Sequence, residues 1–274
     1  MVPSAALSLL PLLVGGPLSP AADSANAVLA ESHARLVEMA SLQATIVQRT
    51  ELDGRRFEST GDYAAGRFPQ MRLRLRSQLA DQTLDFQSVC DGQVLWTVRE
   101  LRSAKSSSDS RESNVDISRY DVDRLRRRLE NATGQRQQLA GQLALGGLHG
   151  MLASIAASFD LVESPKATLE QIVLVGQWKP GRRDELDLNR KGQTATVPTH
   201  IEVTLDRQTL MPVRLLYSVE GTDRTRRTPL LMLELRDVAI NRPLDPAIFE
   251  YAPPETVAYR DLTKQTIDRI DAAE

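Results

Sequence analysis

The sequence predicts a mainly β protein of the α+β class, built as one curved antiparallel sheet with helices packed on its concave side. Strand-like alternation recurs along most of the chain, and short turn signals separate the alternating runs. The helical patterns fall at the N-terminus and in the middle. A sheet with one apolar face must bury that face, so we expect the helices to cover it.

The length of 274 residues and the composition, 41% hydrophobic and 26% charged, favour one large globular domain. The formal net charge of −2 gives no indication of an overall positive potential that would attract nucleic acid. Cys90 is the only cysteine, which excludes an intramolecular disulfide and a cysteine-type zinc site. We expect Cys90 to be a small buried residue on the apolar face, a reactive thiol being the alternative.

Residues 1–27 have the pattern of a secretory signal. An apolar run, Ala5 to Leu18, precedes a small-x-small site at Ala25-Asn26-Ala27, although no Lys or Arg comes before the run. A disordered apolar N-terminus is the alternative. We expect cleavage of 1–27, a domain over 28–262 and a polar C-terminal tail over 263–274. No other stretch of 18 apolar residues indicates a membrane span.

The stretch from Gly61 to Trp96 carries the clearest strand signal, because apolar and polar residues alternate there. Ala80-Asp81 and Asp91-Gly92 are expected as two-residue turns. With the second turn, Leu95 shares a face with Phe86 and Trp96 does not, so Trp96 is expected to be structural. The predicted apolar face comprises Met71, Leu73, Leu75, Leu79, Leu84 and Phe86, and the opposite face Arg72, Arg74, Arg76, Asp85 and Gln87.

The remaining elements are predicted from the strand period of two residues and the helical spacing of apolar residues. The predicted strands are 44–52, 55–65, 171–179, 200–205, 213–221 and 230–240, and the predicted helices are 26–41, 121–132 and 139–161. Charged connectors are expected at 102–114 and 180–198.

The middle helix has an apolar face interrupted by glycines. Leu148, Met151, Leu152, Ile155 and Phe159 form that face. Gly146, Gly147 and Gly150 weaken the helix, each by about 1 kcal/mol relative to Ala. Either the glycines allow close approach of the backbone, or the helix is a loosely held lid.

Motifs for catalysis are missing from the sequence. It contains no Gly-rich phosphate loop, no HExxH, no GxSxG and no paired Cys. Ser154 and His149 lie on one helix without a plausible oxyanion hole. We therefore expect a protein that is not an enzyme and needs no cofactor or metal.

Four segments in order resemble the LolA-type outer-membrane lipoprotein carriers. The similarity covers residues 28–100 and 200–262. The matching segments are Met39–Ala44 leading into a strand, Gly61-Asp62-Tyr63 with Arg67–Arg72, the Cys90–Trp96 hairpin containing Asp-Gly-x-x-Leu-Trp, and Leu244-Asp245-Pro246 with Phe249–Pro254.

This resemblance implies a half-open β-barrel with a helical lid over an apolar cavity. Family members carry acyl chains of lipoproteins across the periplasm or bind lipids and peptides in related roles. In the carriers an Arg before a Pro latches the lid, and Arg67 is the nearest match here, although Phe68 intervenes. The longer charged connectors favour the lipid-binding fold over a strict carrier role.

The predicted ligand-binding residues line the concave face and the lid. The alternative for each of them is that it fills a solid core. The set is Leu73, Leu75, Leu84, Phe86, Leu95, Met151, Leu152, Ile155, Leu215, Tyr217, Leu233 and Phe249, with Arg67 as lid latch.

Three functions follow as hypotheses. The first is an exported, monomeric carrier or binder of an acylated lipoprotein or lipid in the periplasm, with membrane-bound donor and acceptor proteins as its partners and no nucleic acid. The second is an envelope sensor or protein-interaction module on the same fold. A hydrolase with an unrecognised site has the least support.

Overall fold

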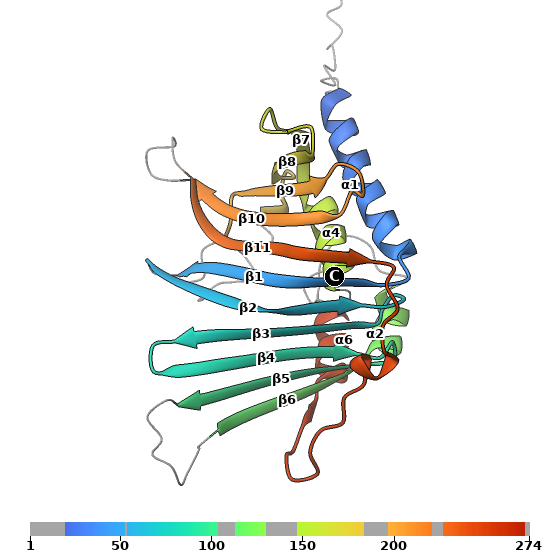
Figure 1. Cartoon of the computed structure of the whole chain (residues 1–274), viewed down its shortest axis with the longest axis vertical. Coiled ribbons are helices and arrows are strands. Elements are labelled where there is room, and N and C mark those ends of the chain that lie inside the picture. The colour runs from blue at the N-terminus through green and yellow to red at the C-terminus, as the bar shows by residue number, and fades with distance from the viewer. Residues whose placement is uncertain are drawn as a thin grey trace, which may run out of the picture.

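The protein, described by a computed structural model over residues 20–52, 54–103, 113–129, 147–183, 197–220 and 227–271, is built on one open sheet (Figure 1). The sheet has 12 strands in the order β12-β6-β5-β4-β3-β2-β1-β11-β10-β9-β8-β7. All neighbouring strands are antiparallel except β12 and β6. The predicted fold class is therefore confirmed.

The elements have the following bounds. The strands are β1 (Leu42–Leu52), β2 (Arg55–Ala65), β3 (Met71–Leu79), β4 (Gln82–Cys90), β5 (Val94–Ser103), β6 (Ser113–Asp121), β7 (Phe159–Glu163), β8 (Gln171–Trp178), β9 (His200–Asp206), β10 (Pro212–Glu220), β11 (Arg227–Ile240) and β12 (Arg260–Asp261). The helices are α1 (Pro20–Glu38), α2 (Val122–Leu129), α4 (Gly147–Ser158) and α6 (Thr263–Asp271), with a 3₁₀ helix η1 (Pro246–Phe249).

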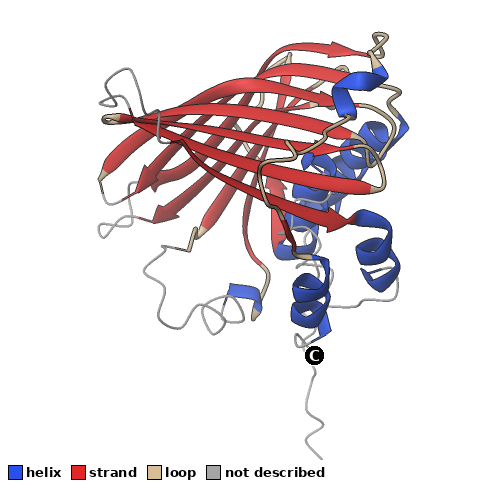
Figure 2. Cartoon of the chain, turned by 90° about the horizontal axis from the view of Figure 1, so that it is seen from below, coloured by secondary structure: helices blue, strands red, loops and turns tan. Residues whose placement is uncertain are grey.

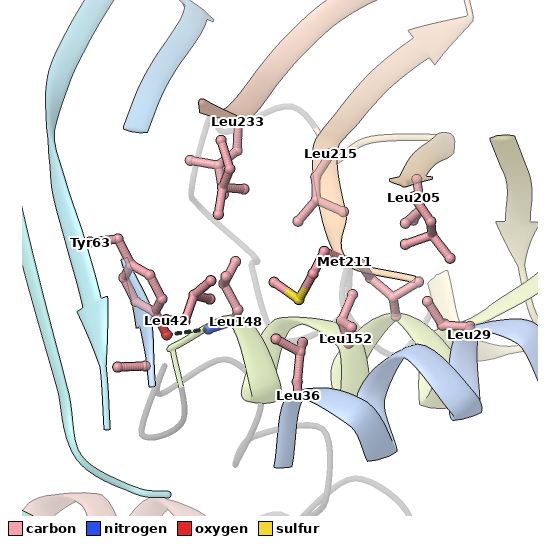
Figure 3. Packing of buried hydrophobic residues seen from close by; sticks show 14 of the residues in the cluster. Leu29, Leu36, Leu42, Tyr63, Leu148, Leu152, Leu205, Met211, Leu215 and Leu233 are labelled. Carbon is pink, nitrogen blue, oxygen red and sulfur yellow. Dashed lines mark hydrogen bonds between the residues drawn. The ribbon is translucent and has the colours of Figure 1, made fainter. Parts of the chain in front are cut away.

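The helices cover the concave face near one end of the strands (Figure 2). Side chains of β1, β10 and β11 meet α4 and α1 there, as Leu215, Leu233 and Leu152 illustrate in Figure 3. Met71, Cys90 and Leu95 belong to the same core cluster. Burial of such apolar surface is the main favourable contribution to folding.

The β3–β4 turn forms as predicted and the β4–β5 turn does not. Leu79 pairs with Gln82, which leaves Ala80-Asp81 as a two-residue turn with Ala80 at φ 51°. Cys90 pairs with Leu95, so the second loop is longer than Asp91-Gly92. The Asp91 carboxylate stabilises this loop by accepting the N–H groups of Gln93 and Val94 at 2.7 and 2.8 Å. The longer loop shifts the pairing of β5 with β4 by two residues. Because side chains alternate with a period of two, Leu95 still lies on the same face as Phe86.

Two strands depart from the prediction. Most of β6 was assigned to no element: only 113–114 belong to the predicted connector and only Asp121 to the predicted helix. Val115 and Ile117 of β6 lie on the convex face, so the usual pattern of an apolar inner face is missing. β7 begins within the last residues of the predicted middle helix, 139–161, and extends beyond it. Phe159 begins β7 and stacks on Trp178 of β8 at 4.2 Å, so pairing with β8 overrides the helical pattern.

At both chain ends the structure shows helices, while cleavage of 1–27 and the polar tail over 263–274 stay predictions. α1 begins at Pro20, so the predicted boundary after Ala27 lies inside a helix in which Ala25 and Leu29 are buried. Within the expected polar tail, α6 packs with Ile270 buried and carries Asp271, which pairs with Arg128 of α2 at 2.6 Å. Residues 1–19, 139–146, and most of the predicted connectors at 102–114 and 180–198 lie outside the described residues.

Candidate functional site

The concave face of β3, β4 and β5 is the candidate site. Strand alternation and the register place Leu75 opposite Phe86, and Leu84 opposite Leu101, on this face. These four residues form a half-buried apolar patch, which we call the open strip. Toward the helices, Met71, Cys90 and Leu95 on the same strands are at most 4% exposed. The concave face thus has a covered end and an open end.

Eleven of the twelve predicted ligand-binding residues lie on the concave side or on its covering helix. Leu95, Leu152, Ile155, Leu215 and Leu233 are buried in the core, and Leu73, Leu75, Met151 and Tyr217 pack against it while partly buried. Leu84 and Phe86 are half-buried outside the core cluster. Whether these residues bind a ligand stays a prediction.

Phe249 lies apart from this set. It is buried in η1, outside the core cluster. Its ring approaches Gly66, at which an added Cβ would lie 3.0 Å from Phe249 Cε2. The sequence could not place it, because η1 is brought to the start of β3 only by the complete sheet.

The N-terminus of α4 is held close to β2 by Tyr63. The Leu148 backbone N–H donates to the Tyr63 hydroxyl at 3.4 Å (Figure 3). Gly147 has φ 52°, and a Cβ there would lie 2.6 Å from the Tyr63 hydroxyl oxygen and 3.1 Å from Met71 Sδ. This glycine therefore permits close backbone approach, the first of the two explanations offered by the sequence. Burial raises the pKa of Tyr63 to about 12, so its hydroxyl is neutral.

The predicted latch residue, Arg67, is exposed in the turn between β2 and β3. Its backbone carbonyl accepts the Gln70 N–H at 2.8 Å. The contact to the helices here comes from its neighbour: the Phe68 ring lies 5.2 Å from the ring of His149 on α4. The latch role of Arg67 stays a prediction, whereas Tyr63 and Phe68 make contacts that the sequence reasoning missed.

His149 is the centre of a junction between α1, α4, α2 and this turn. Its ring lies 6.0 Å from that of His33 on α1, and Arg126 of α2 lies 5.7 Å from the Phe68 ring centre. His149 Nδ1 is buried and has no hydrogen-bond partner within the described part of the chain. Burial, with a smaller contribution from His33, lowers the pKa of His149 to about 4. A histidine on an apolar helix face was the signal that could have indicated this junction.

The convex side carries polar depressions. One of about 520 Å³ is lined by Thr60, Asp85 and Glu100 among others, and another of about 460 Å³ adjoins Thr45 and Asp237. No group of three metal-ligating side chains occurs among the described residues. None of the helices in that part of the chain combines the length and apolar character needed to cross a membrane.

Neither a family model nor a curated protein matches the sequence. Solved structures are similar to it in fold. One is the lipoprotein LppX of Mycobacterium tuberculosis, at 12% identity over 81% of this chain and 98% of that chain, with a TM-score of 0.42. Another is a LolA superfamily protein of Nitrosomonas europaea, at 12% identity over 83% and 97%, with a TM-score of 0.28.

A third is the MucA/MucB complex of Pseudomonas aeruginosa, at 14% identity over 84% of this chain and 61% of that chain, with a TM-score of 0.39. All three likenesses concern the fold alone. At such identities and TM-scores they assign no function.

Proposed function

We propose that the protein is an exported, non-enzymatic binder or carrier of acyl chains, from a lipid or an acylated lipoprotein, that acts in the periplasm as a monomer. The observation that carries this proposal is the open strip, an apolar patch continuous with the core that the described helices leave half-buried. The signal pattern at the N-terminus supports export. Membrane-bound donor and acceptor proteins are its expected partners.

The energetics suit an acyl chain. Each buried methylene contributes about 0.8 kcal/mol, so ten of them contribute about 8 kcal/mol before the costs of association. The open strip provides contact for part of such a chain. In this proposal α4 acts as the lid: its displacement at the Leu148–Tyr63 contact would extend the site toward Leu95 and Leu215.

The test uses the full chain, expressed with its N-terminal segment and purified without detergent. Native mass spectrometry is expected to reveal acyl lipid or lipopeptide near one per chain, and the protein is expected to take up a fluorescent fatty-acid analogue. Phe86→Asp should weaken this uptake at least tenfold, because it puts a charge on the open strip. Gln87→Asp, one residue along β4 on the convex face, is the matched control and should bind normally. Equal uptake by both variants would reject the proposal.

A second candidate, the envelope sensor or protein-interaction module, is favoured by the polar depressions on the convex face. Recovery from envelope extract of one protein partner near equal stoichiometry, together with a lipid-free mass and no uptake of the analogue, would support it over the first.

A further inference from the structure

The concave face of β3, β4, β5 and β6 carries little charge. Strand alternation places two charged residues on it, Arg99 of β5 and Asp116 of β6; the other residues there are uncharged. The convex face of the same strands is rich in Arg, Asp and Glu. A charged side chain on an apolar face is unfavourable unless an ion pair, hydrogen bonds or solvent compensate its charge.

Asp116 has its counter-ion. Arg260 of β12 donates to both carboxylate oxygens of Asp116, at 2.6 and 2.7 Å. Both hydrogen bonds come from one guanidinium nitrogen of Arg260, and this ion pair gives the carboxylate a positive partner. Asp116 is therefore already matched within the protein, although it lies opposite Arg99 in the register.

Arg99 has no counter-ion among the described residues. Its side chain is exposed and makes no ion pair or hydrogen bond with any part of the chain that the structure describes. On the convex side two neighbouring arginines are paired, Arg76 with Asp85 and Arg102 with Glu100, each at 2.6 Å. Within the described ranges, the guanidinium of Arg99 thus keeps its N–H donors free.

The position of Arg99 relates this free charge to the open strip. Arg99 lies directly opposite Phe86, and Leu101 is its next neighbour on the same face. Leu84 lies diagonally across, within reach of a long side chain. The guanidinium is a planar fork whose N–H groups match the oxygens of a carboxylate or phosphate.

We propose that Arg99 binds the anionic head group, a carboxylate or phosphate, of a lipid whose acyl chain lies along the open strip. The inference rests on the proposed function and narrows its ligand to anionic amphiphiles. A neutral or cationic amphiphile of the same chain length makes the same apolar contacts without the charge-assisted hydrogen bonds, so it binds more weakly.

The test compares probes with equal chains and different heads. Dodecanoate, dodecyl phosphate, dodecanol and dodecyltrimethylammonium compete against the bound fluorescent analogue on the full chain. We expect both anions to bind at least tenfold more tightly than dodecanol, and the ammonium compound most weakly. Added salt should reduce this preference. The tighter of the two anions indicates whether a fatty acid or a phospholipid head is the better ligand.

Substitutions locate the effect. Arg99→Met keeps an apolar stem of similar length and should abolish the preference for anions while leaving the affinity for dodecanol unchanged. Arg99→Lys should keep part of the preference, because the charge remains without the fork. Arg74→Met, which removes an exposed arginine of the convex face, is the matched control and should behave as the unmodified protein.

The outcomes separate the two proposals. If no probe binds the unmodified protein, the proposed function itself fails. If dodecanol binds as tightly as dodecanoate, or Arg99→Met retains the preference, the role of Arg99 is wrong while acyl binding stands.

Discussion

The two ends of the concave face use the same strands and the same alternation, yet differ in what covers them. At the covered end, Met71, Cys90 and Leu95 meet helices and are nearly inaccessible to solvent. At the open end, Leu75, Leu84 and Phe86 are half-buried on the same two strands, β3 and β4. An apolar face therefore indicates where a sheet can bury surface, whereas the helices decide which part becomes core and which part is left for another molecule.

The largest effect is expected from truncating a side chain at the covered end. Leu152 of α4 is fully buried, so Leu152→Ala leaves a cavity and should lower the free energy of unfolding by about 2–5 kcal/mol. Leu84→Ala, at the open end, should cost less than about 1 kcal/mol because a half-buried site can stay solvated. Urea denaturation of both variants measures the contrast, and equal losses would contradict the distinction between the two ends.

The next largest effect is expected in the pH dependence of the free energy of unfolding, because His149 is buried at the covered end. The folded-state pKa of about 4 lies below the ordinary 6.5, so the unfolded chain binds the proton more readily. Stability from this group is present above pH 6.5 and should be lost as pH falls from 6.5 to 4, by as much as about 3 kcal/mol. His33, whose pKa is also lowered by burial, acts in the same direction.

The measurement is the difference between the unmodified protein and His149→Gln in unfolding free energy at several pH values, since carboxylates elsewhere titrate in both. The variant should lose the part of the slope between pH 6.5 and 4. A slope unchanged by the substitution would show that His149 is not the responsible group.

The smallest effect is expected at the contact that holds α4 to β2. Tyr63→Phe removes a long hydrogen bond of 3.4 Å, which should lower stability by about 0.5–1 kcal/mol. Amide hydrogen exchange of Leu148 and His149 should become faster, while that of β3 should not change. Unchanged protection of these two amides would mean that the packing of Leu148 and Leu152, rather than Tyr63, holds the helix in place.

The candidate site was predictable from sequence to the extent that it depends on local alternation. The pattern of residues 71–86 identified Leu75, Leu84 and Phe86 as one face and Arg72, Arg74 and Arg76 as the other, and the register confirms both. Trp96 lies on the convex face as predicted, against Tyr251 and Tyr259 at 5.8 and 5.0 Å. The period of two suffices for these assignments, since it needs no knowledge of distant segments.

Residue pairs that are distant in sequence were beyond such reasoning. Tyr63 meets Leu148, 85 residues away, and Asp116 meets Arg260, 144 residues away. β6 lacks the apolar inner face by which a strand is recognised in sequence. Phe249 lies in η1 and not on the concave face with the other predicted ligand-binding residues.

The sequence by itself determined that this is a sheet protein, which strand faces are apolar, and which turn joins β3 to β4, because these depend on backbone preferences and on a period of two residues. Only the tertiary structure decided where the helices end on that sheet and which apolar residues they bury. It also decided that Asp116 pairs with Arg260, whereas Arg99 has no ion-pair partner among the described residues. Burial and charge pairing are properties of surfaces brought together from distant segments, and no local pattern specifies them.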